Sequence, residues 1–293
     1  MTGPEERLRA LRQILDQRVL VIDGAMGTMI HQVPLSVNVD YEGHENCPEI
    51  LVVTRPDVIE NIHRYYFDAG ADAVSTNSFG GTGIALADNH LKHRVHELNF
   101  RAARIAREVA DEFSVDKPRF VAGSMGPTNK DINITGSITF PSLQSAYYKQ
   151  ARALMEGGAD FLLVETAFDT GSLKAALLAI EQLRHDLGMD IPVVASVTIE
   201  RTGTMLGGQA IDALYASIAN HDLLAVGMNC ATGPDLMTDH VRTLAAISRF
   251  PVSCYPNAGL PDAEGNFPET PQSLAAQLEK FVDLGWVNIL GGC

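Results

Sequence analysis

Two of the four cysteines stand where a short apolar run of the sequence ends. Cys230 follows the run at 224–228, and Cys293 follows the run at 287–290. Thiolates at two such ends could hold zinc, which binds cysteine sulfur and keeps one position open where the site is catalytic. A free cysteine is also a small apolar side chain that packs well in a core, so zinc binding and simple burial both stay open from these residues alone. The other two cysteines, Cys47 and Cys254, are expected to be inert.

Two carboxylates also come directly after apolar runs. Asp23 and Glu165 could bind an ammonium group of a substrate, or serve as an acid and base pair. Asp23 could instead cap a turn before Gly24. A capping role explains Glu165 less well, because a carboxylate buried at the end of a strand needs a hydrogen-bonding or charged partner. Gly24 and Gly27 leave room for backbone N–H groups to approach an anion.

These four side chains become neighbours if the runs before them are parallel strands of one sheet. Eight short apolar runs alternate with longer stretches in which apolar residues recur at spacings of three and four, as in strands alternating with helices. Runs that are apolar on both faces indicate a parallel sheet covered by helices. We place the strands at 19–22, 73–75, 119–122, 161–164, 193–198, 224–228, 252–255 and 287–290, and the helices near 5–17, 56–69, 91–113, 142–157, 172–187, 210–220, 234–248 and 271–284.

We expect an α/β fold, a (βα)8 barrel of the TIM type, formed by residues 1–293 as a single domain. Such barrels build their active sites at the carboxyl ends of the strands, and nearly every run here is followed by a polar or thiol group beside Gly or Pro. A doubly wound sheet is the alternative, but no Gly-x-Gly-x-x-Gly follows the first run and no Gly-Lys-Ser/Thr loop occurs. Gly70, Gly158 and Gly285 each stand just before a strand and predict left-handed helix ends.

The composition argues against several classes of protein. The 293 residues include 22 Lys and Arg against 36 Asp and Glu, a formal charge of −14, and the basic residues are scattered along the chain. Binding to nucleic acid or to a membrane surface needs clustered basic residues, so we expect neither partner. The sequence has no secretory signal, no apolar run near the roughly 18 residues of a membrane span, and too few cysteines for a disulfide scaffold. A cytoplasmic location is therefore expected.

Seven motifs, taken in order along the chain, resemble the homocysteine-binding domains of cobalamin-dependent methionine synthases, within the homocysteine S-methyltransferase family. The resemblance runs from residue 18 to the last residue. The motifs are Asp-Gly-Ala-Met-Gly-Thr (23–28), Thr-Asn-Ser-Phe (76–79), Gly-Ser-Met-Gly-Pro-Thr (123–128), Val-Glu-Thr (164–166), Gly-Met-Asn-Cys-Ala-Thr-Gly-Pro (227–234), Pro-Asn-Ala-Gly-Leu-Pro (256–261) and Leu-Gly-Gly-Cys (290–293).

The resemblance implies a role for residues of these motifs. Cys230 and Cys293 match two of the family's three zinc cysteines, and Asn257 matches a residue that can occupy the fourth zinc position. Asp23 and Glu165 match the carboxylates that hold the amino group of homocysteine. The other positions that match the surroundings of the substrate are Gly24, Gly27, Thr28, Ser124 and Asn229.

The sequence departs from the family's pattern in three places. In the family, Gly-Gly-Cys continues with a second cysteine and a last helix, whereas the sequence here ends at Cys293. We therefore expect the third zinc ligand and the last helix to be missing, Cys293 to be frayed, and zinc affinity to be weak. Ser75 stands where the family often has Glu, and the loop at 129–140 looks short.

The implied activity is a zinc-dependent half-reaction. Homocysteine, bound as a zinc thiolate, would accept a methyl group from methylcobalamin and become methionine. Methylcobalamin and methyltetrahydrofolate are expected on a corrinoid-binding and a folate-binding module of the same or a partner protein. The alternatives are a stand-alone homocysteine S-methyltransferase with a small sulfonium or betaine donor, a metal-free barrel hydrolase or lyase that uses the paired carboxylates, and a non-catalytic fragment.

Overall fold

A ring of eight parallel strands forms the centre of the molecule. The structure is a computed structural model and describes residues 3–260 and 269–293. The strands are β1 (Leu20–Val21), β2 (Ala73–Ser75), β3 (Phe120–Met125), β4 (Phe161–Ala167), β5 (Val193–Val197), β6 (Ala225–Asn229), β7 (Val252–Tyr255) and β8 (Ile289–Leu290). Their order is β1-β8-β7-β6-β5-β4-β3-β2, and a parallel bridge between Ile22 and Ala73 brings β1 beside β2. The predicted TIM-type barrel is therefore confirmed.

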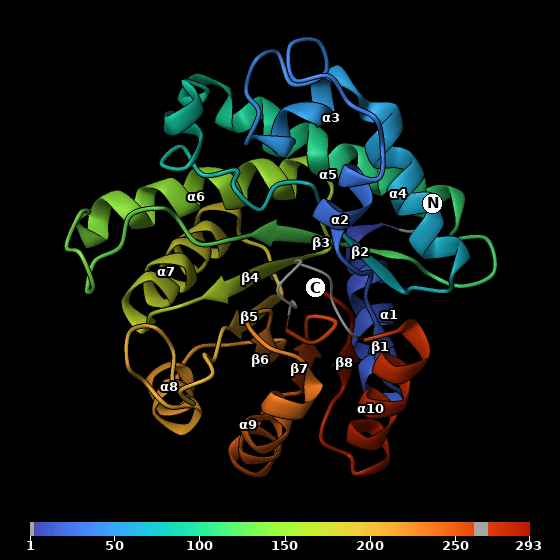
Figure 1. Cartoon of the computed structure of the whole chain (residues 1–293), viewed down its shortest axis with the longest axis vertical. Coiled ribbons are helices and arrows are strands. Elements are labelled where there is room, and N and C mark those ends of the chain that lie inside the picture. Colours follow the sequence, from blue (N-terminus) through green and yellow to red (C-terminus); the bar gives the residue numbers. More distant parts are fainter. Residues whose placement is uncertain (1–2, 261–268) are drawn as a thin grey trace.

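Helices surround the ring. They are α1 (Pro4–Gln17), α2 (Met26–His31), η1 (Pro48–Ile50), α3 (Leu51–Thr54), α4 (Pro56–Asp68), η2 (Leu86–Asn89), η3 (Lys92–Arg94), α5 (Val95–Glu112), α6 (Phe140–Gly157), α7 (Thr170–Leu187), α8 (Ile211–Ile218), α9 (Pro234–Ile247) and α10 (Pro271–Asp283). In Figure 1, α4 to α7 arc round the upper and left sides of the ring, and α8 to α10 complete the lower side. Within the described residues, no helix is both long and apolar enough to cross a membrane.

The predicted helices are all present, with two differences. The helix expected at 91–113 begins as the separate 3-10 turn η3 and becomes α5 at Val95. The connection between β1 and β2 contains the short elements α2, η1 and α3, which the sequence did not predict. Elements of three to six residues are too short to show a helical repeat of apolar residues, which explains why the pattern missed them.

Side chains of each strand alternate between the inside of the ring and the helix layer. In β4, Phe161 and Leu163 belong to the inner cluster, whereas Leu162 and Val164 pack in the cluster that the outer helices share. Both faces of the strand are thus apolar, as the uninterrupted apolar runs predicted. Two helix ends also follow the prediction, because Gly70 and Gly158 both have φ of +109°, a left-handed conformation that glycine adopts without strain.

Three strands run further than predicted. β3 reaches Met125 rather than residue 122, β4 reaches Ala167 rather than residue 164, and β6 reaches Asn229. Ser124 and Glu165 therefore lie inside strands and not in the loops after them. The apolar pattern stops early because side chains at the carboxyl ends of barrel strands face the mouth of the barrel, where polar groups are tolerated.

Helix α1 covers the opposite, amino-terminal end of the barrel. Leu11 is fully buried and belongs to the same inner cluster as Leu20 and Phe120. Two ion pairs attach the helix and its end to the sheet: Arg7 contacts Asp160 at 2.5 Å, and Arg18 contacts Asp72 at 2.6 Å. The barrel is thus closed at one end, which leaves its carboxyl end for ligands.

We expect Leu11→Ala to lower the free energy of unfolding by about 2–5 kcal/mol, because it leaves a cavity in a fully buried cluster. Denaturant titration measures the change. Leu236→Ala on α9 is the matched control, since Leu236 is 47% exposed, and its truncation should change stability by no more than about 0.5 kcal/mol. Equal losses in the two variants would show that α1 does not seal the barrel.

Candidate active site

A cavity of about 340 Å³ lies at the carboxyl ends of β1, β2, β3, β4 and β8. Asp23, Asn229 and Cys230 lie directly behind its wall, where each interacts with a residue that lines it. Asn257 is one step further away and hydrogen-bonds to Cys230. The predicted site residues that line the cavity are Gly24, Gly27, Thr28, Ser124, Glu165 and Cys293.

Asp23 is held by Ser75 on the neighbouring strand β2. The backbone N–H of Ser75 donates to Asp23 Oδ2 over 2.7 Å, and the Ser75 hydroxyl donates to Oδ1 over 2.9 Å. Asp23 does not cap α2, whose N-cap residue is Ala25. The residue is 5% exposed, and burial raises the pKa of Asp23 to about 7 even though both hydrogen bonds favour the charged form.

Glu165 is the second carboxylate of the site, and its side chain is partly buried. The Ser124 hydroxyl on β3 donates to Glu165 Oε1. Burial, with smaller contributions from the neighbouring charges of Asp23 and Cys230, raises the pKa of Glu165 to about 7, although the hydrogen bond from Ser124 opposes the rise. No Lys or Arg occurs among the described residues that line the cavity. A cationic group of a ligand would therefore be the missing partner of both carboxylates.

Asn229 fixes the strand end that carries Glu165. Its Oδ1 accepts from the backbone N–H of Thr166 at 3.0 Å and from the Ser196 hydroxyl at 2.7 Å, while its Nδ2 donates to Thr166 Oγ1 at 2.8 Å. Thr166 lies within a register shift of β4, between Val164 and Ala167, and has φ of +58°, which is unusual for a β-branched residue. The Asn229 side chain, fully buried, thus holds a strained residue beside Glu165.

The sulfurs of Cys230 and Cys293 come together at the ends of β6 and β8. The two thiols hydrogen-bond to each other, Asn257 hydrogen-bonds to Cys230, and Asn229 hydrogen-bonds to Cys293. The contact between the thiols lowers the pKa of Cys230 to about 6 and raises that of Cys293. A thiolate at Cys230, stabilised by a neighbouring thiol, is a soft donor suited to a thiophilic metal ion.

Cys293 is better anchored than we expected. Its backbone N–H donates to the carbonyl of Pro256 over 3.0 Å, and the N–H of Gly292 donates to the carbonyl of Asp23 over 3.1 Å. These bonds connect the residues after β8 to the ends of both neighbouring strands. The expectation of a frayed Cys293 was therefore wrong, because it took no account of main-chain acceptors across the barrel mouth.

The described residues bring two cysteine sulfurs together but do not form a complete metal site. They contain no group of three or more His, Cys, Asp and Glu that could hold a metal ion. Cys47 and Cys254 are buried, and burial raises the pKa of each to about 12, in line with the inert role expected for them. The sulfur pair fits zinc by its chemistry, since zinc accepts cysteine sulfur, but a catalytic zinc usually has three protein ligands.

Gly24, Gly27 and Thr28 of the predicted site differ in how closely other side chains approach them and in their exposure. A Cβ on Gly24 would lie 2.9 Å from the Tyr66 hydroxyl oxygen, so the close approach of Tyr66 requires glycine there. A Cβ on Gly27 would meet nothing within 4 Å, and both Gly27 and Thr28 are exposed on α2. The motif at 256–261 ends with Pro261, which lies outside the described residues.

Two residues of the site escaped the sequence reasoning. Ser75 was noted only as a departure from the family, yet it makes both hydrogen bonds to Asp23. Its place at the end of the strand next to Asp23 was the signal that could have identified it. Glu49 of η1 is 6% exposed, lines the cavity and accepts from the backbone N–H of Gly80 at 2.6 Å. It comes from a long connection whose path the sequence does not reveal.

Comparison with known proteins decides the family. A sequence model of the homocysteine S-methyltransferase family matches residues 20–293, which include all eight strands. The chain belongs to this family. The family is one of methyltransferases, so the predicted family and enzyme class are confirmed.

Relatives of this homocysteine S-methyltransferase chain include a much longer protein. This chain is 45% identical over 299 residues to the methionine synthase of Mycobacterium tuberculosis, and the match covers 100% of this chain and 25% of that protein. The chain thus spans about a quarter of the length of the curated relative that it matches.

Solved structures of similar fold include the homocysteine methyltransferase MmuM from Escherichia coli. Its oxidized form aligns with a TM-score of 0.76 at 21% identity, over 100% of this chain and 95% of that chain. Its metallated form aligns with a TM-score of 0.74 at 22% identity, over 97% of this chain and 94% of that chain. At these identities the alignments bear on the barrel fold alone.

We expect Asp23 to make the metal-free protein less stable as the pH rises. The folded-state pKa of about 7 lies above the ordinary 3.8, so its contribution to stability is complete below pH 4 and is lost as the pH rises through 7. Between pH 5 and pH 8 this loss amounts to about 2 kcal/mol. Asp23→Asn should remove that part of the decline, because its amide can keep both contacts with Ser75 without a charge. Denaturant titrations at the two pH values measure the difference.

The exposed variant Asp212→Asn is the control and should decline with pH as the unmodified protein does. If Asp23→Asn shows that same decline, Asp23 is ionised in the folded state throughout this range and its burial has no consequence for its charge.

Proposed function

We propose that this chain is the homocysteine-binding domain of a methionine synthase, in which the homocysteine sulfur accepts a methyl group to give methionine. The observation that carries the proposal is the meeting, at one rim, of the sulfur pair Cys230 and Cys293 with the carboxylates Asp23 and Glu165, whose pKa values are both raised. Homocysteine has a thiol at one end and an ammonium group at the other, so each end has a complementary group. The 45% identity to a methionine synthase supports the same assignment.

Asp23 and Glu165 would bind the ammonium group of the substrate. Each carboxylate uses one oxygen for a serine hydroxyl, Ser75 for Asp23 and Ser124 for Glu165, and keeps lone pairs for a cation. An incoming ammonium group favours the ionised carboxylates, so their raised pKa values fall when the substrate binds. The backbone at 24–28 lines the cavity and offers N–H groups to the substrate carboxylate.

Cys230, Cys293 and Asn257 would hold zinc. When bound, zinc supplies the positive charge that keeps the homocysteine sulfur a thiolate near pH 7, where a free alkyl thiol with a pKa near 8.5 is mostly protonated. The chain's own part is to fix both ends of the substrate: the two cysteines set the place of the sulfur, and the two carboxylates set the place of the amino group. The nucleophile is then presented in one direction, which lowers the entropic barrier to methyl transfer.

The methyl donor would be held by other modules. Since the chain spans a quarter of the methionine synthase it matches, we propose that methylcobalamin and methyltetrahydrofolate are bound by a corrinoid-binding and a folate-binding module of the same or a partner protein. A small sulfonium or betaine donor would instead mark a stand-alone enzyme. Offering each donor to zinc-loaded protein with homocysteine separates these cases, because only the true donor yields methionine. A metal-free hydrolase or lyase would leave homocysteine unchanged with every donor.

We expect Asp23→Asn and Glu165→Gln each to weaken homocysteine binding by about 1.5–3 kcal/mol, because each removes a charged hydrogen bond to the ammonium group. Calorimetric titration with homocysteine and with its des-amino analogue measures this. The analogue should bind the variants and the unmodified protein alike, which isolates the ammonium group as the cause.

The control for these variants is Glu279→Gln, an exposed carboxylate on α10, which should bind homocysteine with unchanged affinity. Unaltered binding by both site variants would remove Asp23 and Glu165 from the ammonium site, whatever the role of the cysteines.

We expect the 293-residue protein to bind zinc at least about tenfold more weakly than protein with one further cysteine added after Cys293, because a third thiolate completes the usual ligand set. Competition with a zinc chelator measures both affinities. Cys230→Ser should abolish the binding, and Cys254→Ser, with its buried thiol away from the pair, should not. Stoichiometric zinc that resists the chelator in the 293-residue protein would show that two cysteines suffice.

A further inference from the structure

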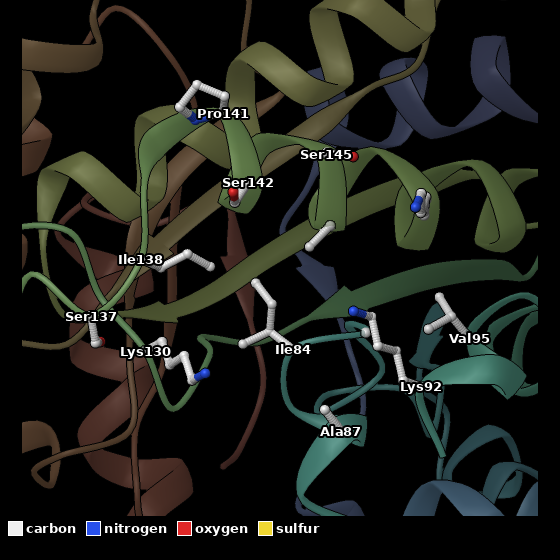
Figure 2. Close-up of a pocket in the computed structure, with 13 residues that line it drawn as sticks. Ile84, Ala87, Lys92, Val95, Lys130, Ser137, Ile138, Pro141, Ser142 and Ser145 are labelled. Carbon is white, nitrogen blue, oxygen red and sulfur yellow. The ribbon is translucent and has the colours of Figure 1, made fainter. Parts of the chain in front are cut away.

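A second and larger cavity lies beside the candidate active site. Its volume is about 640 Å³, within the range of small-molecule sites. The loop after β2 forms one wall through Gly83 and Ile84, and η3 and the start of α5 continue that wall. The loop after β3 and the first turns of α6 form the other wall (Figure 2). No residue lines both this cavity and the one beside Glu165.

Lysines gather around this cavity although they are scattered in the sequence. Three of the six lysines of the chain line it: Lys92, Lys130 and Lys149. In Figure 2, Lys92 and Lys130 extend toward each other from either side of Ile84. No Asp or Glu occurs among the described residues of the lining. None of the three lysines forms an ion pair with a described carboxylate, in a protein whose net charge is −14.

The rest of the lining suits an organic anion rather than a bare ion. Ile84, Val95 and Ile138 provide apolar surface, and Ser142 and Ser145 provide hydroxyl groups from the first turns of α6. The first turn of α6 has no acidic residue, so the partial positive charge of the helix end adds to that of the lysines. A ligand with an apolar body and an anionic end would use both kinds of surface.

We propose that the cavity of Lys92, Lys130 and Lys149 binds a small organic anion, with an apolar body and a phosphate or carboxylate group. The lysine ammonium groups and the serine hydroxyls bind the oxyanion, and the isoleucine and valine side chains cover the body. Both cavities border the loop that follows β2, since Thr76, Asn77 and Phe79 line the first and Gly83 and Ile84 line the second. A ligand in the lysine cavity would therefore lie next to homocysteine without occupying its place.

The test uses three probes on the 293-residue protein: phenyl phosphate, phthalate, and phenol as the uncharged ring. Calorimetry should give saturable binding of phenyl phosphate or phthalate, the stronger of them identifying the anion type, and no binding of phenol. The triple variant Lys92→Gln, Lys130→Gln, Lys149→Gln should weaken that binding at least about tenfold, because it removes three charge-assisted contacts. The matched control is Lys117→Gln, Lys174→Gln, Lys280→Gln, which changes the net charge equally and should keep affinity within about twofold.

A second readout needs no variant. The bound probe should slow the acylation of Lys92, Lys130 and Lys149, followed by mass spectrometry, and leave the other three lysines unprotected. Equal losses of affinity in the two triple variants, or equal protection of all six lysines, would show that binding depends only on the net charge of the protein. Either result would overturn the proposal. Absence of saturable binding by either anion would overturn it too, as would binding of an acidic protein segment alone.

Discussion

The side chain of Asn229 connects three strands at the rim on which the proposed site depends. It bonds to Thr166 of β4 through both its amide groups and to Ser196 of β5, while its own backbone ends β6. A threonine with positive φ costs about 1–3 kcal/mol unless its surroundings compensate, and these buried hydrogen bonds provide that compensation. Glu165 precedes Thr166 in the chain, and Cys230 follows Asn229. The Asn229 amide therefore sets the spacing between the Glu165 carboxylate and the Cys230 sulfur.

The electrostatics of the cavity explain why an amino acid suits it better than a neutral ligand. Asp23 is buried and Glu165 is partly buried, with no Lys or Arg among the described lining residues, so in the free protein these surroundings raise the pKa of both carboxylates. An acid and base pair would instead need the two pKa values to be pushed apart, whereas burial raises both to about 7. Because both pKa values are raised in the same direction, the surroundings suit two ligands for one cation.

The sequence predicted the parts of the molecule that repeat, and missed those that occur once. Apolar runs recur at each βα unit, and glycine helix ends at several of them, which made the barrel and the positions of Asp23, Glu165, Cys230 and Cys293 at one rim predictable. The contact of Ser75 with Asp23 depends on which strand lies beside β1, and therefore on closure of the ring. The bend of β4 at Thr166 depends on side-chain bonds from β6, and no local pattern encodes them.

The choice of methyl donor must depend on surfaces outside the homocysteine cavity. In the proposed function the carboxylates and sulfurs bind the acceptor, and every enzyme that methylates homocysteine faces that same acceptor, so these groups would not distinguish a corrinoid from a small sulfonium donor. Discrimination between donors requires contacts that differ from one to another, and these lie on the loops above the strands. In this chain η3, the loop after β3 and helix α6 together carry three lysines that form no ion pair within the described residues, in a protein with a net charge of −14. The rim beside β2 and β3, rather than the cysteine pair, is therefore where differences in donor or effector recognition among such barrels would be found.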